Sequence, residues 1–94
     1  MSNALQWETP EEINQALALR LRRIRKRKKL SQQALSERCG VSCGSIKRFE
    51  STGMISLLSL TRIAVCLGCA DEIKSLFQNV PYESIEEVIR ENRS

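Results

Sequence analysis

Helix-start and helix-stop signals divide this chain into short segments, and none of these segments has the alternating polar and apolar pattern of a strand. The first start is Thr9 to Glu12 (TPEE), with a capping threonine, a proline at the first helical position and acids in the first turn. The sequence therefore predicts a helix from Pro10 to about Lys28. One apolar stripe runs along it, made of Ile13, Leu17, Leu21 and Ile24.

Serines and glycines mark the later boundaries. Ser31 and Ser42 are expected N-caps, and Gly40 can take the positive φ that ends one helix before the next. The stretch 51–53 (STG) is expected to break the helical pattern. Further helices are predicted from Gln32 to about Cys39, from Ser42 to about Glu50, from about Ser56 to Leu67, and from Ala70 or Asp71 to about Gln78.

These segments predict an all-α fold of five or six short helices in one small domain. Residues 10–78 are expected to form the domain, and residues 1–9 are expected to be disordered or tag-like. Residues 79–94 are interpreted as a C-terminal amphipathic tail. In the tail, Ile85, Val88 and Ile89 share one side of the segment from Tyr82 to Glu91.

Positive charge is concentrated in one part of the chain. Residues 20–48 hold eleven Lys and Arg against the single acid Glu37, whereas the net charge of the whole chain is only +4. Such a basic segment in a small domain is typical of a protein that binds a polyanion. The alternative interpretation, a solvated helix face, stays open from charge alone.

The stretch from Leu30 to Glu50 has the organisation of a helix-turn-helix: a short helix, a glycine turn and a second helix with a serine cap. We expect its inward positions to fix the angle between the two helices; they are Leu35, Cys39, Val41, Ile46 and Phe49. From about Leu21 to Leu76, the chain resembles the helix-turn-helix domains of phage repressors and Cro proteins, the XRE-like family. The matching motifs, in order, are LSQ at 30–32, the glycine turn, Ile46, Glu50 and AxxLG at 64–68.

This resemblance implies a lambda-repressor-like domain that binds double-stranded DNA as a sequence-specific transcriptional regulator. It also implies a partly buried salt bridge between Arg25 and Glu50, the alternative being a solvent-facing Arg25. Gln32 would hold a phosphate at the start of its helix. The chain departs from the family at Ser36, where alanine is usual, and at Glu50–Gly53 (ESTG), where Glu-Asn-Gly is usual.

Base reading is expected from the outward positions of the second helix of this unit: Cys43, Gly44, Ser45, Lys47 and Arg48. Phosphate positioning is expected from Gln32, Gln33, Ser42, Lys28 and Lys29. Arg48 is the best candidate for a bidentate contact to guanine, whereas Gly44 has no side chain and would permit close backbone approach. Side-chain reading by one subunit is therefore sparse.

Sparse reading can be offset by binding as a dimer to a palindromic site, by recognition of DNA shape, or by a second DNA-binding partner. We expect a homodimer with either the apolar side of residues 56–77 or the tail residues 82–90 at the interface. The alternative for the tail is that it folds back on its own core. A narrower resemblance, carried by residues 50–53, the TPEE start and the tail PYESIEE, is to the HipB-like antitoxins encoded beside HipA-like kinases. It implies docking of such a kinase and control of its own operon.

Four cysteines allow two further hypotheses, a zinc site or a redox switch, because Cys66 and Cys69 form a C-x-x-C and Cys39 and Cys43 lie upstream. The preferred interpretation is that Cys39, Cys66 and Cys69 are small apolar core residues. Only Cys43 is expected to be exposed. We predict no metal and no cofactor.

Other classes of protein fit the sequence poorly. The chain has no histidine, and no pair of nucleophile and base can be assembled from it, so we predict no enzymatic activity. The apolar runs are too short to cross a membrane, and no secretory signal is recognisable. We therefore expect a cytoplasmic, nucleoid-associated protein with reduced thiols.

Overall fold

Five helices follow one another in the computed structural model, which describes residues 8–79. They are α1 (Pro10–Arg27), α2 (Gln32–Cys39), α3 (Cys43–Thr52), α4 (Leu57–Cys66) and α5 (Ala70–Lys74). No strand occurs within residues 8–79, so the predicted all-α fold is confirmed for this part of the chain. None of these helices is long and apolar enough to span a membrane. The amphipathic segment expected at Tyr82–Glu91 lies outside the described residues.

The first four helices each begin with a hydroxyl side chain that accepts a hydrogen bond from the backbone N–H three residues later. The four caps are Thr9, Ser31, Ser42 and Ser56. At Thr9 the capping box is complete, because the Glu12 carboxylate also accepts from the Thr9 backbone N–H at 2.9 Å. Such a cap stabilises a helix by about 1 kcal/mol. The start of each helix is therefore fixed by local sequence.

Glycines end α2 and α3. Gly40 has a φ of +74°, as the sequence predicted, and Gly53 has a φ of +83°. The expected break at residues 51–53 is wrong by two residues, because α3 continues through Ser51 and Thr52. Their hydroxyls donate back to backbone carbonyls one turn earlier in α3, at 3.0 and 2.6 Å, so these polar side chains do not compete with the helix.

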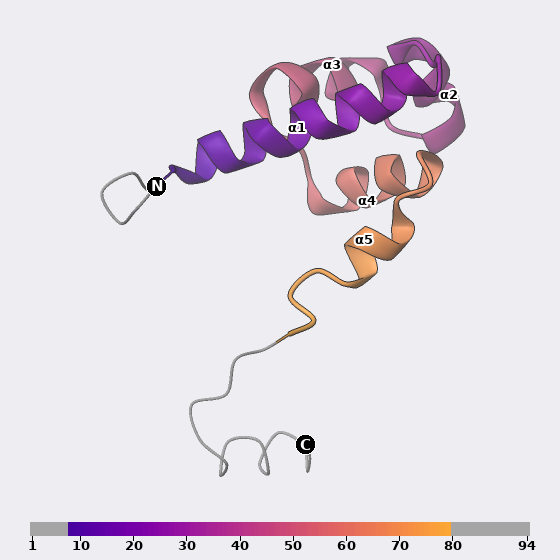
Figure 1. The fold of residues 1–94 in the computed structure, drawn as a ribbon. Helices are drawn as coiled ribbons and strands as arrows, with labels where there is room; N and C mark the ends of the chain where they lie inside the picture. Colours follow the sequence, from indigo (N-terminus) through magenta and orange to yellow (C-terminus); the bar gives the residue numbers. More distant parts are fainter. Residues whose placement is uncertain (1–7, 80–94) are drawn as a thin grey trace, which may run out of the picture.

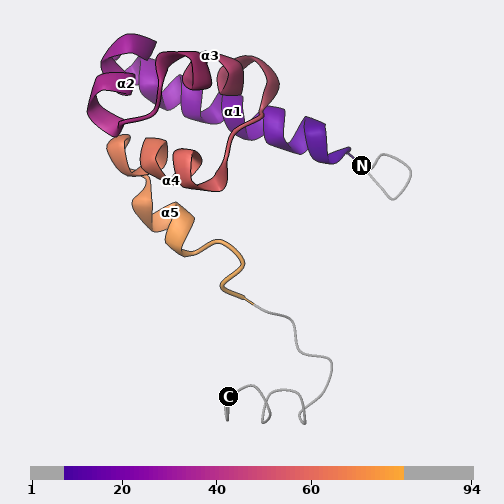
Figure 2. The ribbon, with the colours of Figure 1, turned by 180° about the vertical axis from the view of Figure 1, so that it is seen from behind.

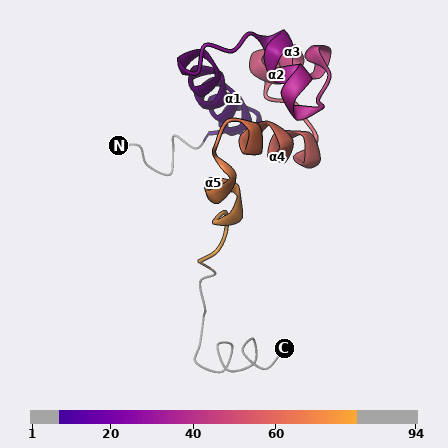
Figure 3. The same cartoon turned by 90° about the vertical axis from the view of Figure 1, so that its right-hand side faces the viewer.

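Helices α1 and α3 pack side by side, α2 closes one end, and α4 lies across the open side (Figure 1). The view from behind shows the same order, with α5 leading away from the end of α4 (Figure 2). Seen from the side, at 90° to the view of Figure 1, α1 lies to one side of the α2–α3 pair and α4 lies beneath both (Figure 3). The core between them is formed by Ala18, Leu35, Cys39, Val41, Ile46, Phe49, Ile63, Ala64 and Leu67. All five inward positions predicted for the helix-turn-helix are buried.

The apolar stripe predicted along α1 is buried only in its second half. Leu21 and Ile24 pack against the core, but Ile13 and Leu17 are 46% and 41% exposed. The first turn of α1, which holds Ile13, extends past its partners (Figure 1). Leu17 lies beside α3 and α4 but lines two open hollows, so its side chain stays partly exposed. Leu57 is likewise 72% exposed, because it is the first residue of α4.

The last helix is shorter than the sequence predicted. α5 ends at Lys74 instead of continuing to about Gln78, and a turn follows. Phe77 has a φ of +57°, a left-handed conformation that no α-helix can include. Leu76 and Phe77 consequently do not pack in the core and are 53% and 90% exposed.

The backbones of α1 and α3 approach each other closely at Gly53. A Cβ atom on Gly53 would lie 2.8 Å from the backbone carbon of Asn14 and 2.8 Å from the backbone nitrogen of Gln15. Gln15 adds a direct link, because its Nε2 donates to the Ser51 carbonyl at 3.2 Å. This contact places the carboxyl end of α3 against the first half of α1.

Gly53→Ala is therefore expected to lower the free energy of unfolding by roughly 2–5 kcal/mol. A left-handed alanine costs about 1–2 kcal/mol, and forcing α1 aside adds about 1–3 kcal/mol. Urea denaturation followed by circular dichroism measures the loss. Gly40→Ala is the matched control, because Gly40 has a similar φ but a Cβ atom there would meet no heavy atom within 4 Å. Equal losses for the two variants would contradict the close contact.

Candidate nucleic-acid interface

Helix α3 has one side in the core and one side open to solvent. Ile46, Phe49 and Glu50 are buried. Four of the five residues expected to read bases are exposed on the other side: Gly44, Ser45, Lys47 and Arg48. The fifth, Cys43, is half-buried and not exposed, so the expectation of an exposed cysteine at this position is wrong. Cys43 precedes Ile46 by three residues and Glu50 by seven, a spacing that turns it partly toward the core.

A buried ion pair fixes α3 on α1. Arg25 donates from Nε to Glu50 Oε2 at 2.7 Å and from Nη2 to Glu50 Oε1 at 2.9 Å, and both side chains are 7% exposed. This is the pair expected from the sequence. The third guanidinium nitrogen, Nη1, donates to the Leu30 carbonyl at 2.7 Å, just before α2 begins. Loss of Arg25 alone would leave a buried carboxylate, at a cost of about 3–5 kcal/mol.

Gln32 joins the same network from the first turn of α2. Its Nε2 donates to Glu50 Oε1 at 2.9 Å, so the amide expected to hold a phosphate already contacts a carboxylate. Gln32 therefore lies near the carboxyl end of α3, about 10 Å along the helix from Cys43. The network links α1, α2 and α3, and no buried side-chain nitrogen or oxygen within residues 8–79 lacks a hydrogen-bond partner.

The network also sets the charge state of Glu50. Burial raises the pKa of the Glu50 carboxyl, but hydrogen bonds from Arg25 and Gln32, together with the charges of Arg25 and Arg22, lower it by more. The net result is a pKa below the ordinary value of 4.5. Arg22 contributes from 3.9 Å and remains half-exposed. Glu50 is thus charged at neutral pH, as an acceptor of three close hydrogen bonds requires.

Two other residues expected to hold phosphates make internal hydrogen bonds. Ser42 caps α3 by accepting from the Ser45 backbone N–H at 3.1 Å, and its hydroxyl donates to Ser45 Oγ at 2.9 Å. Gln33 donates to Glu37 Oε2 at 3.3 Å, one turn later in α2. Ser42 and Ser45 therefore form one hydroxyl cluster at the amino end of α3, and the Ser45 hydroxyl proton remains available for an external acceptor.

Lys28 and Lys29 lie in the turn after α1. The Lys28 ammonium lies beside Gly68, with Nζ 3.8 Å from the position of a Gly68 Cβ. That location is the carboxyl end of α4, where a positive charge is favoured by the helix dipole. Lys29 has a φ of +59°, which turns the chain toward α2. The structure thus places the Lys28 ammonium at the end of α4.

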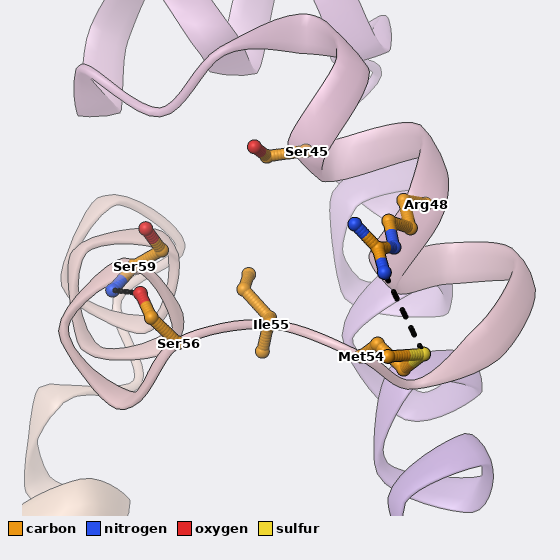
Figure 4. Close-up of a pocket in the computed structure, with 6 residues that line it drawn as sticks. All are labelled: Ser45, Arg48, Met54, Ile55, Ser56 and Ser59. Atoms are coloured by element: carbon orange, nitrogen blue, oxygen red, sulfur yellow. Dashed lines mark hydrogen bonds between the residues drawn. The ribbon is translucent and has the colours of Figure 1, made fainter.

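A hollow of about 380 Å³ lies between α3 and the start of α4. Ser45 and Arg48 line it from α3, Ser56 and Ser59 line it from the first turn of α4, and Met54 and Ile55 form its floor (Figure 4). The Arg48 Nη2 donates to Met54 Sδ at 3.9 Å, so the guanidinium lies along this hollow. Met54, Ser56 and Ser59 were not predicted as site residues, since their spacing shows no binding motif.

Gly44 leaves open space on the exposed side of α3. A Cβ atom there would meet no heavy atom within 4 Å. Unlike Gly40 and Gly53, Gly44 has no positive φ that would require glycine. The free protein therefore offers no packing or backbone reason for glycine at this position.

Three of the four cysteines lie in or against the core. All four are free thiols; Cys39 is buried, whereas Cys66 and Cys69 are half-buried against the core. Burial raises the pKa of the Cys66 thiol, and the neighbouring Cys39 raises it further, against a smaller opposing effect of Arg38. Within residues 8–79, no three Cys, Asp or Glu side chains converge as a metal site would require. A raised pKa also disfavours the reactive thiolate.

Because of Glu50, the free energy of unfolding is expected to fall at acid pH. Because the folded-state pKa of Glu50 is lowered, its contribution to stability is complete above pH 4.5. The contribution is lost as the pH falls through the lowered pKa. Urea denaturation between pH 7 and pH 3 should show this loss, and Glu50→Gln should remove that part of the pH dependence. Glu37→Gln, at an exposed carboxylate of α2, is the control. The same acid dependence in E50Q and wild type would contradict the assignment.

Comparison with known families matches residues 16–71 to a family described as a helix-turn-helix domain. The match covers more than half of the chain and includes α2 and α3 completely. Comparisons with curated proteins and with solved structures give no match. The match agrees with the resemblance to XRE-like regulators and does not extend to the narrower HipB-like group. The buried Arg25–Glu50 pair and the open side of α3 lie within the matched residues. The chain belongs to the helix-turn-helix domain family.

Proposed function

We propose that this protein is a sequence-specific transcriptional regulator, a repressor that binds double-stranded DNA through α3. The observation that carries the proposal is the orientation of α3. Its inner side is held by the Arg25–Glu50 pair and by Ile46 and Phe49, and its outer side exposes Lys47 and Arg48. A rigid helix with a polar outer side suits insertion into the major groove.

Arg48 is the principal reading residue in this proposal. It is exposed on α3, and its guanidinium has five donors, whereas the hydrogen bond it makes within residues 8–79 is to a weak sulfur acceptor. Exchanging that contact for the O6 and N7 of guanine would yield two strong hydrogen bonds. Lys47 supplies a second charge, and Ser45 contributes a hydroxyl next to the same hollow.

Phosphate contacts would come from the start of α2 and α3. Backbone N–H groups at both helix starts favour an anion, and Gln32, Gln33, Ser42, Lys28 and Lys29 remain the proposed ligands. Gln32 and Ser42 already make internal hydrogen bonds, so in this proposal they also orient the helix starts whose N–H groups face the phosphate. Lys28 would have to turn away from Gly68 to reach a phosphate.

The regulator is proposed to act as a homodimer. With Gly44 lacking a side chain and Cys43 turned inward, one subunit reads few bases, and a palindromic site read twice would compensate. Leu57, Leu58 and Val65 on α4 are 72%, 61% and 55% exposed, which is unusual for three large apolar residues on one helix. They fall within the residues 56–77 expected at the interface.

The same exposed residues of α4 favour a second candidate function, docking of another protein. The partner would be a HipA-like kinase, with this chain as its antitoxin. The two functions use different surfaces, α3 for DNA and α4 for protein. A change at Arg48 should therefore abolish DNA recognition without affecting kinase neutralisation.

Arg48→Ala is expected to weaken binding to the preferred DNA site by about 1–3 kcal/mol, because a bidentate contact to guanine is lost. The site is first selected from random duplexes with the wild-type protein and footprinted. Affinities are then measured at one fixed salt concentration, since salt alone changes them strongly. Arg20→Ala is the control, because Arg20 lies on the far side of α1 near α5. Equal affinity of R48A and wild type would disprove the reading assignment.

Gly44→Ala is expected to stabilise the protein by about 0.5–1 kcal/mol, since alanine favours a helix and its methyl meets open space. The same change should weaken DNA binding by on the order of tenfold, about 1.4 kcal/mol, because the methyl holds α3 away from the groove. Thermal unfolding and DNA titration measure the two effects separately. Unchanged DNA affinity in a stabilised G44A would mean that the backbone does not approach DNA closely there.

A further inference from the structure

An apolar cleft of about 170 Å³ lies between α1, α4 and α5, away from the outer side of α3. Apolar side chains from all three helices line it: Leu17, Leu21, Ile24, Leu60, Ile73 and Leu76. Its mouth is open, since Leu17 is 41% and Leu76 is 53% exposed. Phe77, the next residue, is 90% exposed. Such a concentration of open apolar surface beside α5 indicates that another segment covers it.

We propose that residues 82–91 of the same chain cover this cleft. The sequence of that segment places Ile85, Val88 and Ile89 at helical spacing, so three branched apolar side chains share one side. This side matches a cleft that is itself lined by leucine and isoleucine. The segment is the one remaining stretch after α5 with such a pattern.

The position of the chain after α5 brings the segment to the cleft. Leu76 lines the cleft, and Asn79 follows only three residues later. The connection from Asn79 to Tyr82 can span about 10 Å, roughly one helix diameter. A connection this short gives the segment an effective concentration in the millimolar range. The chain's own segment therefore outcompetes the same segment of a second copy at ordinary protein concentrations.

Charge supports the same occupant. The segment carries Glu83, Glu86, Glu87 and Glu91 against the single base Arg90. Arg20 lines the cleft from α1, and Arg23 and Arg27 follow at helical spacing and are exposed. Glu72 is the one acid among the lining residues. An acidic segment with one apolar side thus complements an apolar cleft with a basic edge.

The test is Val88→Asp in the full chain, with Arg90→Gln as the matched control. Both make the segment more negative by one unit, but at helical spacing Arg90 lies opposite the apolar side. V88D is expected to change the amide NMR shifts of Leu21, Leu60 and Ile73. It should also speed amide hydrogen exchange in α5 by on the order of tenfold, the factor that burying one aliphatic side chain supplies. R90Q should change neither, and exchange at Ile46 should stay constant in both variants because the core is intact.

A second variant tests the cleft itself. Leu76→Asp puts a charge at the open mouth and should accelerate exchange in α5 as V88D does, with no further increase in the double variant. The proposal is overturned if V88D leaves the cleft shifts and α5 exchange as in wild type, or if the effects of L76D and V88D simply add. It is also overturned if light scattering shows a wild-type dimer that V88D converts to a monomer, because a second copy then covers the cleft.

Discussion

The buried carboxylate of Glu50 is the point on which the arrangement of the first three helices depends. A charge that is removed from water must be matched, and Arg25 and Gln32 match it from two different helices. Arg25 also uses its remaining nitrogen on the Leu30 carbonyl, which fixes the chain between those helices. An apolar contact would tolerate sliding, whereas this set of directional bonds fixes one orientation of α3. A helix that reads DNA needs that fixed orientation.

This arrangement has a consequence for recognition. Polar side chains near the start of α2 and α3 orient the backbone, as Gln32 and Ser42 do through their internal bonds. In the proposed DNA complex few side chains are then left for base contacts, and the principal one, Arg48, lies over the hollow toward α4. Accurate placement of α3 would then compensate for a small number of contacts. Binding by two subunits would multiply the effect of each well-placed contact.

The sequence predicted features that depend on local chemistry. The serine caps, the glycine at position 40 and the inward residues of the helix-turn-helix follow from a few neighbouring positions. It misjudged Ser51 and Thr52, because their hydroxyls can either break a helix or bond back to it. It also misjudged Leu17 and the end of α5. Whether Leu17 is buried depends on how tightly α3, α4 and α5 close around it, which no local pattern reveals.

The apolar surface that α1 and α4 leave uncovered has two ends. One end is the cleft beside α5, and the other surrounds Leu57 at the start of α4. Leu17 and Leu60 line both hollows, so the two ends are continuous. If the chain's own tail covers the α5 end, the start of α4 remains for a second subunit. That end adjoins the hollow lined by Arg48 and Ser56, so a dimer formed there would set the spacing of the two reading helices directly.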